Sequence, residues 1–141
     1  MSRKNGFTLV ELVVVVLILG ILAAVAVPKI LNNGDDAADS GVAQTLASIR
    51  DAIELYRTKA NAGGYPNGAN SVAIQNKLLP SLRGSVFPKV NVGGLSSNVI
   101  KIATPLAISS NGEGWVYDPT NGEIMINSNS LNGAGIKYSD L

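Results

Sequence analysis

A single carboxylate near the start of a long apolar run is the side chain best placed to do chemistry in this sequence. Residues 6–11 read Gly-Phe-Thr-Leu-Val-Glu, and the apolar run continues to Pro28. A charged side chain is costly in lipid, so it is a functional candidate by default. Cleavage after Gly6 would create an ammonium group on Phe7, at the positive end of the helix dipole, which Glu11 could offset. If the chain were cut there, Glu11 would therefore have a role beyond that of a residue in a membrane anchor.

Glu11 also has a purely structural interpretation. Thr8 and Glu11 have the spacing of a capping box, in which each side chain accepts a hydrogen bond from a backbone N–H at the start of a helix. This role needs no charged partner, and the two roles can coexist.

The apolar segment is long enough to cross a membrane. Residues 7–27 would form about 31 Å of helix at 1.5 Å per residue, which matches a hydrocarbon core of roughly 30 Å. Arg3 and Lys4 precede the segment. The positive-inside rule therefore places the N-terminus in the cytoplasm and everything after Pro28 beyond the inner membrane.

A secretory signal peptide is the competing interpretation of this segment. Arg3 and Lys4 would form its basic region, and residues 24–26, Ala-Val-Ala, would form its cleavage site. Two observations argue against it: Glu11 interrupts the apolar run, and the run is longer than the usual apolar region of about 7 to 15 residues.

Together these residues resemble the processing and assembly signal of type IV pilins and type II secretion pseudopilins. The short basic leader, Gly6, Phe7, Glu11 and the apolar helix all stand at that family's spacing. The resemblance implies that a prepilin peptidase cuts between Gly6 and Phe7 and N-methylates Phe7. It also implies that Glu11 pairs with the Phe7 ammonium of a neighbouring subunit during assembly. Pro28 stands where pilin helices commonly leave the membrane-embedded segment.

The composition argues against several other functions. The chain of 141 residues has no cysteine and no histidine, so it lacks thiol chemistry, the commonest general base and the commonest metal ligand. Its serines have no histidine for a triad, and no glycine-rich segment continues into a phosphate loop. The formal charge is +1, without the basic stripe of a nucleic-acid binder. We expect no enzyme activity, no cofactor and no nucleic-acid partner.

An amphipathic helical segment follows the apolar one. Its large side chains recur at helical spacing and predict one buried face; they are Val42, Leu46, Ile49, Ile53 and Tyr56. We expect this helix to end near Lys59, before the glycines at 63 and 64. Pro28 and Gly34 are the points where the helix is expected to be flexible. A helix of that length, roughly 80 Å, needs lipid or other copies of itself to cover it.

The residues after the long helix predict short elements. Residues 72–79 could form a short helix, and residues 82–92 read as a connecting loop. Strand signals begin at residues 98–103, which are rich in β-branched side chains.

A β-hairpin is predicted near the C-terminus. Residues 114–117 and 123–126 flank a turn with Asp-Pro and Asn-Gly, and with the preceding strand they would form a three-stranded antiparallel meander. Trp115 is expected to lie in the core. The turn approaches the oxygen spacing of a calcium loop, but Gly122 falls one position early, so a plain turn is the stronger interpretation. Residues 128–140 read as a polar surface tail.

The hairpin also resembles the closing hairpin of pseudopilins. Major pseudopilins usually carry an acidic calcium-binding loop near the C-terminus. Only Asp140 is acidic after Ile126 in this chain, so we expect no metal site.

The expected architecture is α+β and pilin-like. A long N-terminal α-helix, half transmembrane and half amphipathic, packs on a small antiparallel β-sheet. The expected divisions are a leader at 1–6, a transmembrane and polymerisation helix at 7–27, an amphipathic half at 28–60 and a globular head at 61–141.

The resemblance implies a structural subunit of a helical filament, most closely a type II secretion pseudopilin for protein export. The alternative is a type IV pilin for adhesion, motility or DNA uptake, and a third possibility is a secreted binding domain with an ordinary signal peptide. The implied partners are the prepilin peptidase, further pilin-like subunits, an inner-membrane assembly platform and the lipid bilayer. The implied location is the inner membrane, single-pass, with the head in the periplasm or, in a pilus, at the cell surface.

Overall fold

The structure is a computed structural model that describes residues 6–59, 64–109 and 111–141. For residues 28–36 it describes the backbone only. Arg3 and Lys4 lie outside the described residues. The chain divides into two compact units, Met1–Gly34 and Asp35–Leu141, and each is considered by itself.

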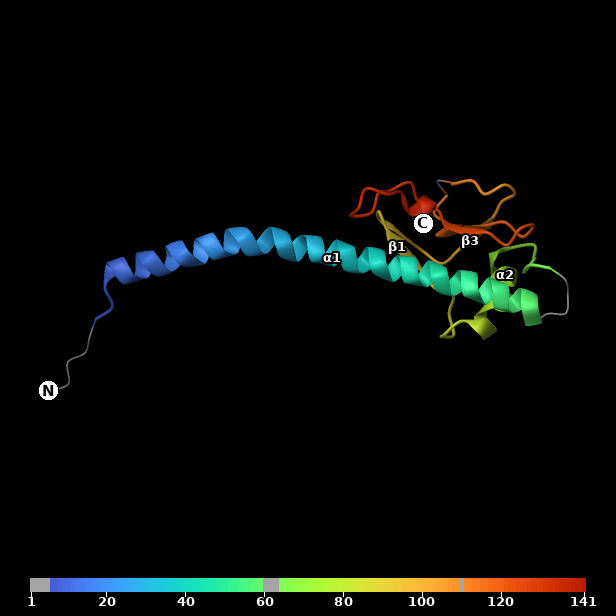
Figure 1. Cartoon of the computed structure of the whole chain (residues 1–141), viewed down its shortest axis with the longest axis horizontal. Coiled ribbons are helices and arrows are strands. Elements are labelled where there is room, and N and C mark those ends of the chain that lie inside the picture. The colour runs from blue at the N-terminus through green and yellow to red at the C-terminus, as the bar shows by residue number, and fades with distance from the viewer. Residues whose placement is uncertain (1–5, 60–63, 110) are drawn as a thin grey trace. The chain divides into compact units, whose positions relative to one another are not determined.

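The described secondary structure is α+β, as predicted. The helices are α1 (Leu9–Lys59), α2 (Ser71–Leu78) and the 3-10 turns η1 (Leu79–Ser81) and η2 (Tyr138–Asp140). The strands are β1 (Val90–Val92), β2 (Leu95–Ser97), β3 (Ile100–Ile102), β4 (Trp115–Tyr117) and β5 (Ile124–Ile126). Figure 1 shows the strands on one side of the second half of α1.

The first unit contains the apolar half of α1. Leu9–Val27 has a mean hydropathy of 3.1, and none of it is buried within the chain. By length and composition this stretch could cross a membrane. Its many valines are poor helix formers in water, but in lipid a helix satisfies every backbone polar group internally. A helix of this composition is therefore suited to lipid or to contact with other apolar helices.

α1 is continuous through Pro28 and Gly34. The helix is therefore uninterrupted at both positions in this structure, and flexibility there stays a prediction. Residues 60–63, which were expected to end the helix after Lys59, lie outside the described residues.

The second unit is built on the predicted stripe of α1. Four of the five stripe residues are buried, and Tyr56 packs half-buried against the same core. The core residues contributed by the head include Ile74 of α2, Trp115 and Tyr117 of β4 and Ile126 of β5. Trp115 is fully buried, donates from Nε1 to the Pro88 carbonyl at 3.0 Å and meets the Phe87 ring edge-on. The predicted core position of Trp115 is thus confirmed.

The three-stranded sheet is mixed, so the predicted antiparallel meander is wrong in one pairing. β4 and β5 form the predicted antiparallel hairpin, with Trp115 opposite Ile126. β3 instead runs parallel to β4, with Ile100 opposite Trp115. Residues 103–114 connect the two, and about a dozen residues is the length that a parallel crossover needs. A tight turn would have been required for the meander.

Two segments expected to be irregular are structured. β1 lies inside the predicted loop 82–92 and pairs with β2 as an antiparallel hairpin. Gly93 and Gly94 form its two-residue turn with φ of 53° and 79°, which is the Gly-Gly pattern favoured in such turns. Residues 128–140 are mostly exposed, as expected of a surface segment, but Ser128 and Tyr138 are buried and anchor the segment on the core. Val90 and Val92 of β1 and Tyr138 of the C-terminal segment are all part of the core, which holds both segments in place.

Tyr117 provides a test of this packing. Its hydroxyl is buried without a hydrogen-bond partner among the described residues, and burial is the main cause that raises its pKa. An unsatisfied buried polar group costs about 1–3 kcal/mol, so Tyr117→Phe should leave the head as stable as before or more stable. Tyr138→Phe is the matched control and should destabilise it, because the Tyr138 hydroxyl donates to Asp39. Urea unfolding followed by the fluorescence of Trp115 measures both, and a large loss of stability in Tyr117→Phe would contradict the packing.

Candidate processing and assembly site

The predicted capping box is present at the start of α1. The Thr8 backbone N–H and hydroxyl both donate to Glu11 Oε2, at 2.9 and 2.8 Å. The Glu11 backbone N–H donates in return to Thr8 Oγ1 at 3.3 Å. The Leu12 N–H then donates to the Thr8 carbonyl. Thr8 is therefore the N-cap residue that precedes α1, and Glu11 lies in the first turn of the helix.

The box leaves Glu11 able to accept a further partner. Both side-chain bonds use Oε2, and Oε1 has no hydrogen bond to any residue within the described ranges. The box also involves no atom of Gly6 or Phe7, so cleavage between them would leave it intact. A capping role and an assembly role for Glu11 are therefore geometrically compatible.

The predicted cleavage bond is open to an enzyme. Gly6 and Phe7 precede α1 and are exposed, with Phe7 at 77%. A Cβ added at Gly6 would meet no atom within 4 Å, so no packing inside this chain requires a glycine there.

The apolar face that follows is fully exposed. The large side chains of Leu9–Val27 are uncovered by any part of the chain that the structure describes. Exposed apolar surface of this extent marks a membrane or protein contact. The site therefore consists of an accessible peptide bond, a carboxylate that takes part in capping the helix, and a long apolar helix without a partner among the described residues.

The turn between β4 and β5 is a hairpin turn, as the stronger interpretation had it. Asp118 Oδ1 accepts hydrogen bonds from the Thr104 hydroxyl and from the N–H and hydroxyl of Thr120. The Asp118 N–H donates to the Glu123 carbonyl at 2.9 Å. Within the described residues no group of three or more acidic, histidine or cysteine side chains could hold a metal ion.

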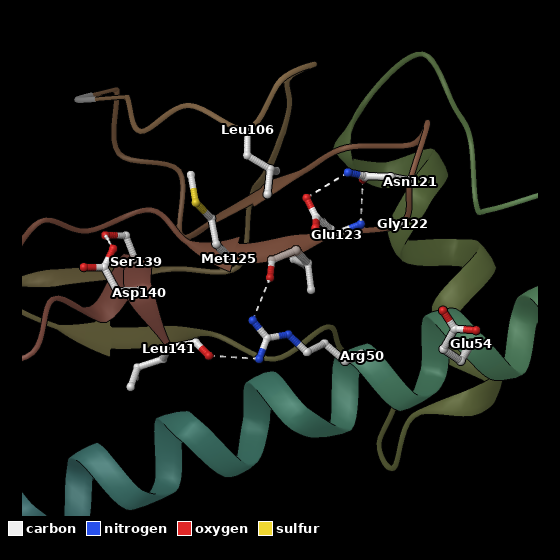
Figure 2. Close-up of a pocket in the computed structure, with 11 residues that line it drawn as sticks. Arg50, Glu54, Leu106, Asn121, Gly122, Glu123, Met125, Ser139, Asp140 and Leu141 are labelled. Carbon is white, nitrogen blue, oxygen red and sulfur yellow. Dashed lines mark hydrogen bonds between the residues drawn. The ribbon is translucent and has the colours of Figure 1, made fainter.

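Two residues of α1 make long-range polar contacts that the sequence did not predict. Asp39 accepts hydrogen bonds from the Tyr138 hydroxyl and, at 2.7 Å, from the Gly133 N–H. Arg50 donates to the carbonyls of Leu141 and Ile124, at 3.0 and 3.3 Å (Figure 2). These bonds hold the C-terminal segment against α1. No local sequence signal marks them, because the partners are separated by 74 to 99 positions.

Acid should weaken the head through these carboxylates. The Tyr138 hydroxyl, and then the Gly133 N–H, lowers the pKa of Asp39, and the Thr120 hydroxyl lowers that of Asp118. Their folded-state pKa values lie below the unfolded value near 3.9. The bonds therefore stabilise the head above about pH 4, and this contribution is lost as the pH falls through the folded values.

Asp39→Asn should accordingly be less stable than the parent at neutral pH, with the difference disappearing in acid. Urea midpoints followed by Trp115 fluorescence, from about pH 7 down to about pH 2, provide the measurement. A difference that stays constant across this range would show that Asp39 does not act through its charge.

Comparison with known proteins places this geometry in a family. Residues 1–27 match the prokaryotic N-terminal methylation motif. The chain is 41% identical over 95 residues to the type IV narrow pilus major component of Thermus thermophilus, across 59% of this chain and 82% of that protein. It is 39% identical over 66 residues to the type II secretion system core protein G of Klebsiella pneumoniae, across 47% of this chain and 46% of that protein. The corresponding protein of Aeromonas hydrophila is 34% identical over 76 residues, across 53% and 52%. No solved structure matches.

The fold and the site define a pilin-like protein: a methylation motif, a capped apolar helix that can anchor in a membrane, and an α+β head. The chain belongs to the superfamily of type IV pilins and type II secretion pseudopilins. It spans about half the length of the two core G proteins named above.

Proposed function

We propose that this chain is a structural subunit of a helical, pilus-like filament, and specifically a pseudopilin of a type II secretion system that exports proteins. The observation that supports this proposal most strongly is the N-terminal methylation motif, which is followed by an exposed apolar helix. The similarity to core protein G of two organisms supports the secretion assignment.

In this proposal the subunit waits in the inner membrane with its N-terminus in the cytoplasm and its head in the periplasm. A prepilin peptidase cuts between Gly6 and Phe7 and methylates the new terminus. The assembly platform then lifts the subunit into the filament, where apolar helices cover one another. The Phe7 ammonium of one copy and the free Oε1 of Glu11 on its neighbour would neutralise each other away from water. That pair would set the axial register.

Flexibility of α1 at Pro28 and Gly34 belongs to the same proposal. Proline removes a backbone donor and glycine lowers helix stability by about 1 kcal/mol relative to alanine. Local unwinding between them would let the apolar half adjust as it leaves the bilayer. Pro28→Ala should alter the filament geometry, and filaments of unchanged rise and twist by cryo-electron microscopy would contradict this role.

A type IV pilin is the second candidate. The Thermus thermophilus relative favours it, because the match covers 82% of that pilus component but only about half of the core G proteins.

Complementation separates the two candidates. The chain would be expressed in a secretion-deficient strain lacking its own core protein G, and in a pilus-deficient strain lacking its major pilin. Restored export with periplasmic filaments would support the pseudopilin. Surface filaments in the second strain alone would instead support the pilin, and filaments in neither would count against the proposed function.

A further inference from the structure

A groove with acidic walls lies between α1 and the closing hairpin. Its volume is about 540 Å³. The carboxylates of Glu54, Glu123 and Asp140 line it, and half-buried Leu106 and Met125 supply apolar surface (Figure 2). The one cation in the lining, Arg50, donates to two backbone carbonyls. We call this the acidic groove.

The carboxylates of the acidic groove make only weak or local interactions within the chain. Glu54 forms the single salt bridge of the described residues, at 3.4 Å to Arg57, and both side chains are more than half exposed. Exposed pairs of this kind contribute little, so Glu54 could exchange its partner readily. Glu123 and Asp140 accept hydrogen bonds from the neighbouring Asn121 and Ser139. The lining therefore carries three carboxylates against the one guanidinium of Arg50, an excess of negative charge beside apolar surface.

A surface of the opposite character follows η1. Residues 83–89, which we call the basic loop, carry Arg83 and Lys89, both exposed. Neither forms a salt bridge with a residue in the described ranges. Val86, between them in sequence, is 64% exposed. The basic loop therefore has two cations, one on either side of an exposed apolar side chain. In charge and polarity it is complementary to the acidic groove, which has three carboxylates around an apolar floor.

The basic loop and the acidic groove belong to opposite sides of α1. Arg50 and Glu54 line the groove, whereas the α1 residues that line the hollow beside Arg83 are Thr45, Ser48, Asp51, Ala52 and Leu55. At 100° per residue, the centres of these two sets are about 145° apart around the helix. Figure 1 likewise shows η1 and the following loop across α1 from the three-stranded sheet. The loop therefore cannot reach the groove of its own chain.

We propose that the basic loop of one subunit docks in the acidic groove of the next copy of this chain, an inference that rests on the proposed filament function. Arg83 and Lys89 face the groove carboxylates, and Val86 covers the apolar floor. Because the two surfaces differ, the contact is head-to-tail, and such contacts build open helical polymers when they do not close into a ring. Both surfaces lie along the same stretch of α1, so the docked copies stand beside each other with at most a small shift along the helix axis.

Cysteine cross-linking tests the contact on the full chain in assembled filaments. The chain has no cysteine of its own, so Val86→Cys combined with Met125→Cys offers one possible pair. A disulfide reaches only about 7 Å between Cα atoms, which excludes a bond across α1 within one subunit. We expect a ladder of cross-linked multimers from the double variant. The matched control replaces Val86→Cys with Val72→Cys, of similar exposure at 60%, and should give no ladder.

Charge reversal provides a second, independent readout. Arg83→Glu with Lys89→Glu should cause loss of filaments, and adding Glu123→Lys with Asp140→Lys should restore them. Lys137→Glu, an exposed cation outside both surfaces, is the control and should assemble normally. Filaments that form without the ladder, or that survive the reversal at residues 83 and 89, would overturn the docking and leave the proposed function standing. Absence of filaments from the unaltered chain would overturn the proposed function itself.

Discussion

Replacing Glu11 with glutamine should abolish filament assembly while leaving cleavage of the leader intact. Glutamine keeps a side-chain oxygen that can accept from Thr8, so the capping box survives the change. It removes the negative charge that would neutralise the Phe7 ammonium. Removing one partner of a desolvated ion pair strands the other charge and is strongly destabilising. We expect at least about a 100-fold loss of filaments, counted by electron microscopy of sheared cells.

Thr8→Ala is the matched control for this prediction. It removes the hydroxyl that donates to Glu11 and accepts from its backbone N–H but keeps the charge. Loss of an N-cap costs about 0.5–2 kcal/mol of helix stability, which neighbouring apolar helices can compensate. The variant should therefore still assemble. Filaments from Glu11→Gln together with their loss in Thr8→Ala would reduce Glu11 to a capping residue.

Trp115→Ala should unfold the head or bring it close to unfolding. The Trp115 side chain is fully buried, stacks edge-on with Phe87 and donates to the Pro88 carbonyl. Truncating a buried tryptophan costs about 3–5 kcal/mol, a large share of the 5–15 kcal/mol that stabilises an ordinary domain. Because the indole joins β4 to the segment before β1, both sheets should loosen together.

Limited proteolysis across a urea series, on the full chain in detergent, measures this loss without needing the tryptophan signal. Val72→Ala is the control, because its side chain is 60% exposed, and its stability should change by no more than about 0.5 kcal/mol. A Trp115→Ala head that resists protease as well as the parent would show that the indole does not hold the two sheets on α1.

The elements that the sequence predicted well are those with a local signature. The stripe on α1 follows from helical spacing, and the β4–β5 hairpin follows from its turn residues. The hairpin of β1 and β2 also had a readable signal, because Gly93 and Gly94 follow the alternating Val90 and Val92 and precede Leu95, but the surrounding polar residues obscured it. The parallel pairing of β3 with β4 had none, since strand direction depends on the path of residues 103–114.

The candidate site divides in the same way. Gly6, Phe7 and Glu11 lie within six positions, so the resemblance to the processing and assembly signal of pilins could be recognised from a short stretch of sequence. The contacts of Asp39 with Tyr138 and of Arg50 with Leu141 join residues that are far apart in sequence. Such contacts exist only once the core has brought the C-terminal segment onto α1. Sequence spacing therefore could not have predicted them, nor the acidic groove that the same segment helps to form.

Intact mass and N-terminal sequencing of the chain, co-expressed with a prepilin peptidase, test the central claim most directly. A product that begins at N-methylated Phe7 is the predicted result and would establish the processing on which filament assembly depends. A product that begins at Val27, after residues 24–26, would identify an ordinary signal peptide and contradict the pilin-like function. An uncut chain that still begins at Met1 in the presence of active peptidase would contradict it as well.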